Sequence, residues 1–204
     1  DKIRQVNTCE ITNRKEYMDA ERDLIMYLQK YKDADDDKIE KALRGEVMVR
    51  INILRQISAR GKVRDVIEFV KDFRENGKKI ILFCSLHEVV DQLKRYFPTA
   101  VSVTGRDSQD VKQRAVDAFQ NNPKTDIIIC SIKAAGVGLT LTASSNVAFV
   151  EFPWTYADCC QCEDRAHRIG QKDSVTCYYF LGRRTIDEKV YRIIQEKKNI
   201  ANAV

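Results

Sequence analysis

Hydrophobic segments long enough to cross a membrane are missing from this sequence. The longest apolar runs reach about six residues, whereas a membrane-spanning helix needs about 20. No signal peptide opens the chain, which begins with Asp1 rather than Met, and this start suggests a piece cut from a longer protein. We therefore expect no membrane partner.

Long blocks of one charge sign and internal repeats are absent as well. Charged residues make up 32% of the chain and are spread along it, so we expect disorder only in a short acidic patch at residues 33–37. The 204 residues are 44% hydrophobic, which is enough for a sizeable core. The formal net charge of +5 is a mild indication of a polyanionic partner.

The motifs that grip a nucleoside triphosphate are also missing. The Walker pattern Gly-x-x-x-x-Gly-Lys-Ser/Thr does not occur, and no strand ends in an Asp-Glu pair that would hold magnesium. Gly136 and Gly138 begin a dinucleotide fingerprint, but Leu141 occupies the third glycine position. The two glycines either let the backbone approach a phosphate or nucleic-acid strand, or simply form a tight strand-to-helix turn. By itself, this chain is not expected to enclose a triphosphate.

The cysteines are seven, an odd number, and most lie in apolar surroundings. This pattern is typical of reduced thiols in an intracellular protein. Cys159 and Cys162 form a C-x-x-C that allows a metal or redox site, but a structural zinc needs a second pair and only Cys177 lies downstream. The pattern favours small residues packed against a sheet, and we expect no metal ligands here.

Apolar runs alternate with amphipathic stretches from Lys79 onward. The runs "KKIILFCS", "AVSV", "DIIICS", "NVAFVE" and "VTCYYFL" lack polar alternation, which is typical of strands buried on both faces. Helical spacing of apolar residues separates them, Gly77 closes an earlier helix that carries Val66 to Phe73, and a capping box at residues 185–188 opens a last helix. The fold class is therefore α/β, with a parallel sheet flanked by helices.

Residues 1–60 follow another pattern. A possible strand at Val6–Ile11 is followed by two apolar stripes at helical spacing, separated by an acidic linker at Lys32–Lys38. The stripes are Tyr17, Leu24, Leu28 and Tyr31, then Ile39, Leu43, Val47, Ile51 and Leu54. We expect residues 1–60 to form a helical bracing segment that precedes a domain at residues 61–204.

The stretch "QCEDRAHRIGQ", residues 161–171, gathers Arg165, His167 and Arg168. Cations are common in the last turn of a helix, and Gly170 suits the left-handed residue that ends one. That explanation does not require a glutamine at both ends or two arginines three residues apart. The stretch fits arginines that reach the charge developing on a transferred phosphoryl group, so the chain is expected to supply half of an ATP site.

Together these motifs resemble the Swi/Snf family of superfamily-two helicase-like ATPases. The glycine stretch "SIKAAGVGLTLTASS", the segment "NVAFVEFPWTYADCCQ" and "QCEDRAHRIGQ" are similar to motifs V, Va and VI of that family, and "KIILFCS" looks like motif IV. The resemblance covers roughly residues 62–200. It implies the second of two RecA-like lobes that bind ATP between them, with Mg²⁺ held by the first lobe.

The resemblance also implies the roles of particular residues. Arg165 and Arg168 look like the pair that reaches the phosphates, while Gly136 and Gly138 look like the motif V backbone that links the nucleotide to DNA. Gln161 is similar to the glutamine that opens motif VI, placed to orient the arginines or to contact the nucleotide. The positions that imply contact with double-stranded DNA are Ser85, Thr104, Gly105, Ser131, Lys133 and Trp154. Trp154 is equally well explained as a partly buried aromatic at a strand end. His167 is expected to orient the arginines rather than to transfer a proton.

Two departures from the family pattern concern Thr155-Tyr156, where the family has Asn-Pro, and Cys162, where it has Ala. The first affects the expected DNA contact and the second is a small-for-small exchange. The expected function is the second motor lobe of an ATP-driven double-stranded DNA translocase, whose partner is the N-terminal lobe of the same parent chain. A non-catalytic DNA- or protein-docking module is the alternative. The expected location is the cytoplasm or nucleoid of a bacterium, or the nucleus of a eukaryote.

Overall fold

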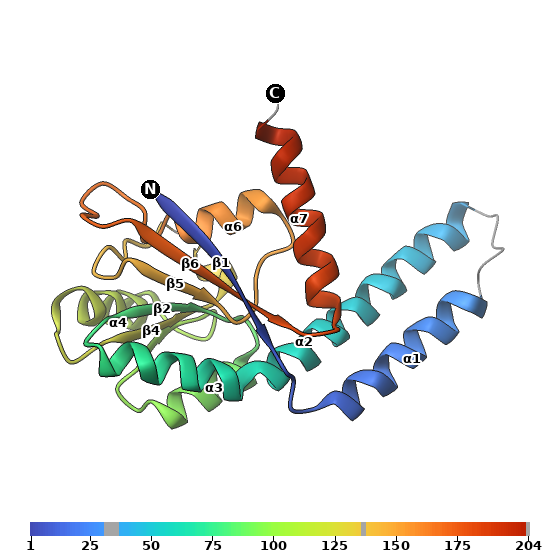
Figure 1. Cartoon of the computed structure of the whole chain (residues 1–204), viewed down its shortest axis with the longest axis horizontal. Coiled ribbons are helices and arrows are strands. Elements are labelled where there is room, and N and C mark those ends of the chain that lie inside the picture. Colours follow the sequence, from blue (N-terminus) through green and yellow to red (C-terminus); the bar gives the residue numbers. More distant parts are fainter. Residues whose placement is uncertain (31–36, 136–137, 203–204) are drawn as a thin grey trace.

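The structure is a computed structural model that describes residues 1–30, 37–135 and 138–202 (Figure 1). Its strands are β1 Lys2–Cys9, β2 Ile80–Phe83, β3 Val101–Val103, β4 Ile127–Cys130, β5 Asn146–Phe149 and β6 Val175–Gly182. Its helices are α1 Arg14–Lys30, α2 Asp37–Glu75, α3 His87–Tyr96, α4 Gln109–Asn121, α5 Ile132–Ala135, α6 Tyr156–Glu163 and α7 Ile186–Asn202. All five strands expected after Lys79 are confirmed.

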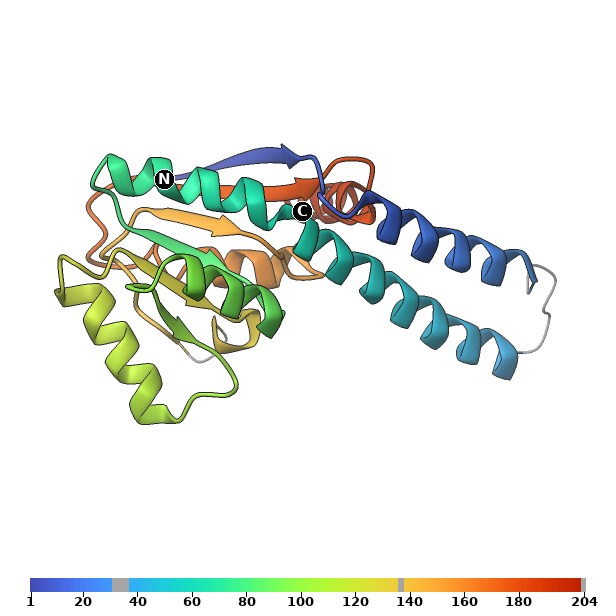
Figure 2. The ribbon, with the colours of Figure 1, turned by 90° about the horizontal axis from the view of Figure 1, so that it is seen from below.

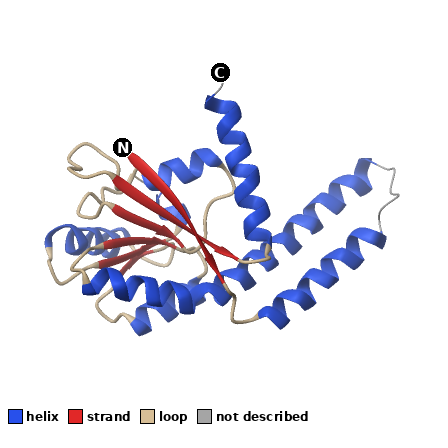
Figure 3. Ribbon diagram, viewed as in Figure 1, coloured by secondary structure: helices blue, strands red, loops and turns tan. Residues whose placement is uncertain are grey.

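The six strands form one sheet in the order β1-β6-β5-β2-β4-β3, and every neighbouring pair is parallel. Helices lie on both sides of this sheet, as Figure 3 shows. Successive residues of a strand point to opposite faces, and here both faces are covered. Ile80 and Leu82 pack with α2 and α3 on one face, while Ile81 and Phe83 pack with α4, α6 and α7 on the other.

Strand β1 belongs to the sheet rather than to a segment that precedes it. It lies at one edge and pairs along its whole length with β6, from Lys2 beside Val175 to Cys9 beside Gly182. The expected strand at Val6–Ile11 therefore exists, but it begins at Lys2 and already ends at Cys9. Because the pairing joins residues more than 170 positions apart, the local pattern of residues 1–11 could not reveal it.

Helix α2 is one continuous helix of 39 residues, where the sequence suggested two separate helices. Its first half pairs with α1 and projects beyond the sheet, and its second half covers the sheet (Figures 1 and 2). The boundary that we expected between residues 60 and 61 falls inside this helix. The acidic linker at Lys32–Lys38 lies mostly outside the described residues.

The apolar stripe expected on α1 is only partly correct. Tyr17 and Leu24 are buried against Leu54 and Ile57 of α2, but Leu28 is 47% exposed, and Tyr31 lies outside the described residues. Among the described residues, no helix combines the length and apolar composition that crossing a membrane requires.

The expected helix ends at Gly77 and Thr185 are both present. Gly77, with φ of +68°, donates to the carbonyl of Arg74 just after α2 ends. At the start of α7, the Thr185 hydroxyl accepts from the amide of Asp187, and the Glu188 carboxylate accepts from the amide of Arg184. This is a variant of the expected capping box, in which the Thr185 hydroxyl would accept the amide of Glu188 and the Glu188 carboxylate the amide of Thr185. The Asp187 carboxylate, between them in the sequence, forms a buried ion pair with Lys62.

Candidate functional site

Residues 164–171, which we call the arginine turn, follow α6 directly. The expectation that the cations occupy the last helical turn is wrong, because α6 ends at Glu163. The Glu163 carbonyl accepts the amides of Ala166 at 3.2 Å and His167 at 3.1 Å, which closes the chain into consecutive tight turns. Gly170, with φ of +102°, lies within these turns rather than at the end of a helix. A residue with a side chain would be strained at that φ.

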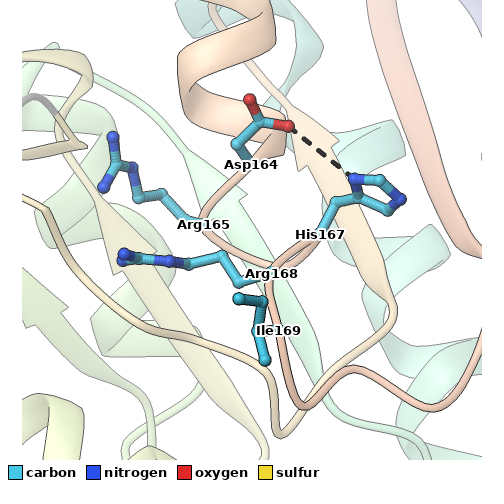
Figure 4. A pocket seen from close by; sticks show the side chains of 5 residues that line it. All are labelled: Asp164, Arg165, His167, Arg168 and Ile169. Atoms are coloured by element: carbon cyan, nitrogen blue, oxygen red, sulfur yellow. Dashed lines mark ion pairs between the residues drawn. The ribbon is translucent and has the colours of Figure 1, made fainter.

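The arginine turn lines an open pocket of about 580 Å³, formed by Asp164, Arg165, His167, Arg168 and Ile169. Figure 4 shows Arg165 and Arg168 pointing to the same side of the turn, whereas His167 points the other way, toward Asp164. The His167 Nδ1 atom lies 3.9 Å from an Asp164 carboxylate oxygen. The arrangement thus sets two guanidinium groups side by side, with the imidazole turned away from them.

Backbone and hydroxyl oxygens, rather than carboxylates, hold both arginines. Arg165 is only 9% exposed and donates from Nε to the Gln161 carbonyl at 3.1 Å. Arg168 is exposed and donates from Nη1 to the carbonyls of Gly138 and Leu139 and to the Thr140 hydroxyl, each at 3.1 Å. Neither guanidinium forms an ion pair with a carboxylate anywhere in the described part of the chain.

The electrostatics of the pair follow from that arrangement. Burial lowers the pKa of Arg165 from its ordinary value, and the neighbouring charge of Arg168 lowers it further. Two unneutralised cations that repel each other favour an anion between them. Guanidinium donors suit phosphate oxygens, so the two arginines fit the ATP that the family resemblance implies. They do not fit Mg²⁺, because guanidinium groups do not ligate metal ions. Within the described residues, no group of three or more His, Cys, Asp or Glu side chains could hold a metal ion.

A second segment, the glycine loop (residues 138–145), lies against the arginine turn. The Leu141 amide donates to the Arg165 carbonyl at 2.9 Å. Gly138 has φ of +78°, and a Cβ atom placed there would lie 3.9 Å from a terminal nitrogen of Arg165. Of the two glycines expected to approach the nucleotide, Gly138 therefore lies beside the arginines, whereas Gly136 lies outside the described residues. Gln161 contributes its carbonyl oxygen, and its side chain is exposed.

Gln171 joins the two segments, a role that the sequence did not predict. Its Nε2 atom is directed at the carbonyl oxygens of Ser144 at 2.9 Å, Ala166 at 3.2 Å and Thr142 at 3.3 Å. The second glutamine of the motif was the available signal, since a side-chain amide can satisfy several backbone groups at once. Glu163, which the sequence also gave no role, is fully buried directly before the turn.

The residues expected to contact DNA all follow the carboxyl ends of strands, where parallel sheets usually bind ligands. Ser85 follows β2, Thr104 and Gly105 follow β3, and Ser131 and Lys133 follow β4. The loops after β2 and β4 touch, because the Ser85 hydroxyl accepts the amide of Ile132 at 3.3 Å. Lys133 is exposed, and a side chain at Gly105 would meet open space.

The hydroxyls of Thr104 and Ser131, like that of Ser85, are engaged within the protein. Thr104 is 1% exposed and donates its hydroxyl to Asp107 at 3.1 Å. The Ser131 hydroxyl accepts the amide of Ala134 at 3.2 Å at the start of α5. At Thr104 and Ser131, therefore, the loops offer backbone groups to a ligand rather than a free hydroxyl.

Trp154, after β5, is 39% exposed and packs on the guanidinium of Arg55, whose Cζ lies 4.2 Å from a ring centroid. Arg55 also lies over Phe152 and donates to the Phe152 carbonyl. Burial lowers the pKa of Arg55. Trp154 thus packs against a side chain of α2. The sequence did not predict this contact, because Arg55 lies about 100 residues away from Trp154 in the chain.

The C-x-x-C cysteines are packed in the core, as the sequence favoured. Cys159 and Cys162 are 2% and 1% exposed in the cluster that covers one face of the sheet. Burial raises the pKa of Cys159 to about 12, so its thiol stays protonated at neutral pH. A protonated, buried thiol is a poor metal ligand and a poor nucleophile.

The all-parallel sheet with helices on both faces and the arginine turn at its side define a RecA-like lobe of the α/β class. The helicase conserved C-terminal domain matches residues 61–170, more than half of the chain. The chain belongs to this family, as the C-terminal lobe of a Swi/Snf-type superfamily-two ATPase.

Individual relatives agree with this assignment. The chain is 33% identical over 145 residues to the Xenopus tropicalis SWI/SNF-related matrix-associated actin-dependent regulator of chromatin subfamily A-like protein 1. The match covers 69% of this chain but 15% of that relative, so the chain spans only a small part of its length.

Solved structures show the same fold. The C-terminal part of the Fun30 ATPase domain has a TM-score of 0.77 at 17% identity, covering 95% of this chain and 89% of that one. The Sulfolobus solfataricus SWI2/SNF2 ATPase core in complex with double-stranded DNA has a TM-score of 0.77 at 21% identity, covering 98% of this chain and 45% of that one.

Proposed function

We propose that this chain is the second motor lobe of an ATP-dependent double-stranded DNA translocase. In this proposal Arg165 and Arg168 are arginine fingers for an ATP molecule whose phosphates and Mg²⁺ are held by a first lobe of the same parent chain. The observation that carries the proposal is the pair of guanidinium groups that point to one side of an open pocket and have no carboxylate partner in the described residues.

The arginines would act on charge that develops during hydrolysis. As the γ-phosphoryl group leaves, negative charge accumulates on its oxygens, and guanidinium donors placed there stabilise it. An arginine finger contributes about 10³–10⁵ in rate, which corresponds to about 4–7 kcal/mol of barrier. Arg165 is buried and held by a backbone carbonyl, so it is placed in advance, whereas exposed Arg168 must exchange three neutral acceptors for phosphate oxygens.

The glycine loop would link this event to DNA. The loop begins after α5, which carries Lys133 and lies at the carboxyl ends of the strands. It ends before β5, at the amino ends of the strands, beside the arginine turn. Closure of the two lobes around ATP and reopening after hydrolysis would therefore move the loops after β2, β3 and β4 relative to the first lobe. Two lobes that hold the DNA backbone in turn would step along it. In a eukaryote, such an activity would be located in the nucleus.

The test replaces each arginine in the full-length parent protein. Arg168→Ala should lower DNA-stimulated ATP turnover by about 10³-fold or more while duplex affinity stays nearly unchanged, because the finger acts on the transition state. Arg165→Ala should act in the same direction, but its burial adds a structural effect. Arg183→Ala is the matched control, because that exposed side chain pairs only with exposed Glu10 in the described structure, and turnover should be retained.

Two outcomes would contradict the proposal. If Arg168→Ala lost DNA affinity in proportion to turnover, the arginines would be contacts to the DNA backbone. If it left both unchanged, the lobe would serve as a docking module without a part in catalysis.

A further inference from the structure

Directly before the arginine turn, the fully buried Glu163 carboxylate lies among the partly exposed cations Arg4 and Lys2 and the buried hydroxyl of Tyr179. Arg4 of β1 donates to it from Nε at 2.8 Å and from Nη2 at 2.7 Å, which makes a bidentate pair. The Tyr179 hydroxyl of β6 donates to the same carboxylate at 2.9 Å, and Lys2 lies 3.5 Å away. The Glu163 side chain is 0% exposed, and that of Arg4 is 19% exposed.

The charges in this cluster depend on one another. Burial alone would raise the pKa of Glu163, but the hydrogen bond and charge of Arg4, together with Tyr179 and Lys2, outweigh it and lower the pKa. A buried carboxylate that loses its cation is strongly destabilised, whereas a neutral pair of similar size is often tolerated. Arg4 and Glu163 are thus a single unit, with one member on the first strand and the other at the end of α6.

Glu163 also determines the path of the arginine turn. Its carboxylate is held by β1, and its own carbonyl accepts the amides of Ala166 and His167. The next residue is tied to the same strand, because the Asp164 carboxylate lies 2.6 Å from Lys2 Nζ. Glu163 and Asp164, where α6 leads into the turn, are therefore both anchored to β1. Arg165 and Arg168 follow Asp164 by one and four residues.

Arg4 contacts α6 at more than its last residue. Its guanidinium lies 5.7 Å from the centroid of the Tyr156 ring, and its Nη2 atom lies 3.8 Å from the Cys160 sulfur. Together with Glu163, these residues follow one face of the helix at spacings of four and three. The guanidinium therefore fixes the rotation of α6 about its own axis as well as the position of its end.

We propose that Arg4 and Glu163 are positioning residues that hold the arginine turn in the orientation needed to reach ATP. The strand that opens the chain thereby becomes part of the ATP half-site, although no residue of it lines the pocket. This inference rests on the proposed function, since it assigns the pair a role in aiming Arg165 and Arg168. Misplacement of a catalytic group by about 1 Å can lower a rate by about 10²-fold.

The first experiment measures amide hydrogen exchange in the 204-residue chain and requires no ATP turnover. The variant Arg4→Met/Glu163→Gln removes the ion pair without leaving a buried charge. The amides of Ala166 and His167 should exchange about tenfold faster or more, because hydrogen bonds to charged groups contribute about 1.5–3 kcal/mol. Amides of Ile128 and Ile129 in central β4 report global unfolding, so an effect on the turn must exceed any change in them.

Two control variants separate this effect from general weakening. Arg74→Met/Asp126→Asn removes an ion pair between α2 and the residue before β4, at 2.9 Å, far from the turn in the chain. Gln5→Ala changes an exposed residue of β1 next to Arg4. Neither should accelerate exchange at Ala166 or His167 beyond the change at Ile128 and Ile129. Equal exchange at the turn in the Arg4→Met/Glu163→Gln variant and in the unmodified chain would overturn the proposal.

The second experiment measures ATP turnover in the parent protein. Arg4→Met/Glu163→Gln should lower kcat by about 10- to 100-fold with KM for ATP changed far less, because the misplaced group acts in the transition state. Arg4→Lys, which keeps one charged contact, should recover part of the loss. Unchanged kcat in a parent protein that does respond to Arg168→Ala would overturn the positioning role alone. Failure of Arg168→Ala to lower kcat would instead overturn the proposed function.

Discussion

The side-chain amide of Gln171 donates a hydrogen bond to the carbonyl oxygen of Ser144, 2.9 Å away. The same nitrogen is directed at the carbonyls of Thr142 and Ala166, so one side chain joins the arginine turn to the glycine loop. A half-buried donor that serves several backbone acceptors is costly to remove, because each acceptor then loses a donor away from water, although the Ala166 carbonyl keeps the amide of Arg168.

Gln171→Leu should therefore lower the free energy of unfolding of the 204-residue chain by about 1–3 kcal/mol. Urea unfolding followed by circular dichroism measures it. The matched control is Gln113→Leu on α4, whose exposed amide contacts only exposed Asp117 in the described structure and should change stability by less than about 0.5 kcal/mol. Equal stability of the two variants would show that the Gln171 contacts contribute nothing measurable.

The isolated chain should bind ATP weakly and hydrolyse it no faster than background. Its pocket offers guanidinium donors, but the parts that grip the β- and γ-phosphates and Mg²⁺ belong to the proposed first lobe. Calorimetric titration with Mg-ATP and a phosphate-release assay, each with and without duplex DNA, would measure both quantities. DNA-stimulated turnover that survived repurification of the fragment would contradict the half-site interpretation.

Stability in acid should depend on Glu163. Its pKa in the folded chain is lowered from its ordinary value of 4.5, because the contacts with Arg4 outweigh burial. Ionised Glu163 therefore stabilises the fold above the unfolded-state pKa, and this contribution is lost as the pH falls through the lower folded-state pKa. Urea unfolding between about pH 6 and pH 3 should show a smaller loss of stability on acidification for Glu163→Gln than for the unmodified chain.

Glu10→Gln provides the comparison, because the carboxylate of Glu10 is half exposed and its ion pair with Arg183 is screened by water. That variant should keep the pH dependence of the unmodified chain. If Glu163→Gln also kept it, the carboxylate would not be ionised in the buried cluster.

The central sheet was predictable because its strands are encoded locally. Runs such as Ile127–Cys130 are apolar at every position, and only burial on both faces explains that composition. The continuity of α2 was not predictable, because Gly61 interrupts the helical pattern. In the structure, a Cβ atom at Gly61 would lie 2.2 Å from the Asn13 side chain, so this glycine permits close packing inside a helix.

The candidate site, like the fold, could be predicted from the sequence only in part. The two arginines were found from their spacing and the family resemblance, but the turn that carries them was predicted as the end of a helix. What shapes the turn is the pairing of Glu163 with Arg4, 159 residues away, and no local pattern contains such information. Gln171 was noticed only as an unexplained residue, because two of its three acceptors are backbone atoms of the glycine loop, a distant part of the sequence.

Binding of duplex DNA is expected to depend on phosphate contacts at the carboxyl edge of the sheet, where Lys133 is exposed after β4. A translocase must step along any sequence, so its contacts should fall on phosphates rather than on base edges. Each neutralised phosphate adds about −0.9 to the slope of log affinity against log salt. A net charge of +5 favours only a few such contacts, which predicts a slope of roughly −2 to −4 and a Kd of about 10⁻⁴–10⁻⁶ M.

Lys133→Ala should reduce the magnitude of that slope by about one unit on every duplex tested, because one phosphate contact is lost. Lys124→Ala is the matched control, since Lys124 is also exposed but precedes β4, at the amino ends of the strands, and should leave the slope unchanged. Fluorescence anisotropy titrations of two unrelated duplexes across a salt series would measure both variants. A strong preference for one duplex, or a slope that responds to Lys124 and not to Lys133, would place the DNA-binding face elsewhere on the lobe.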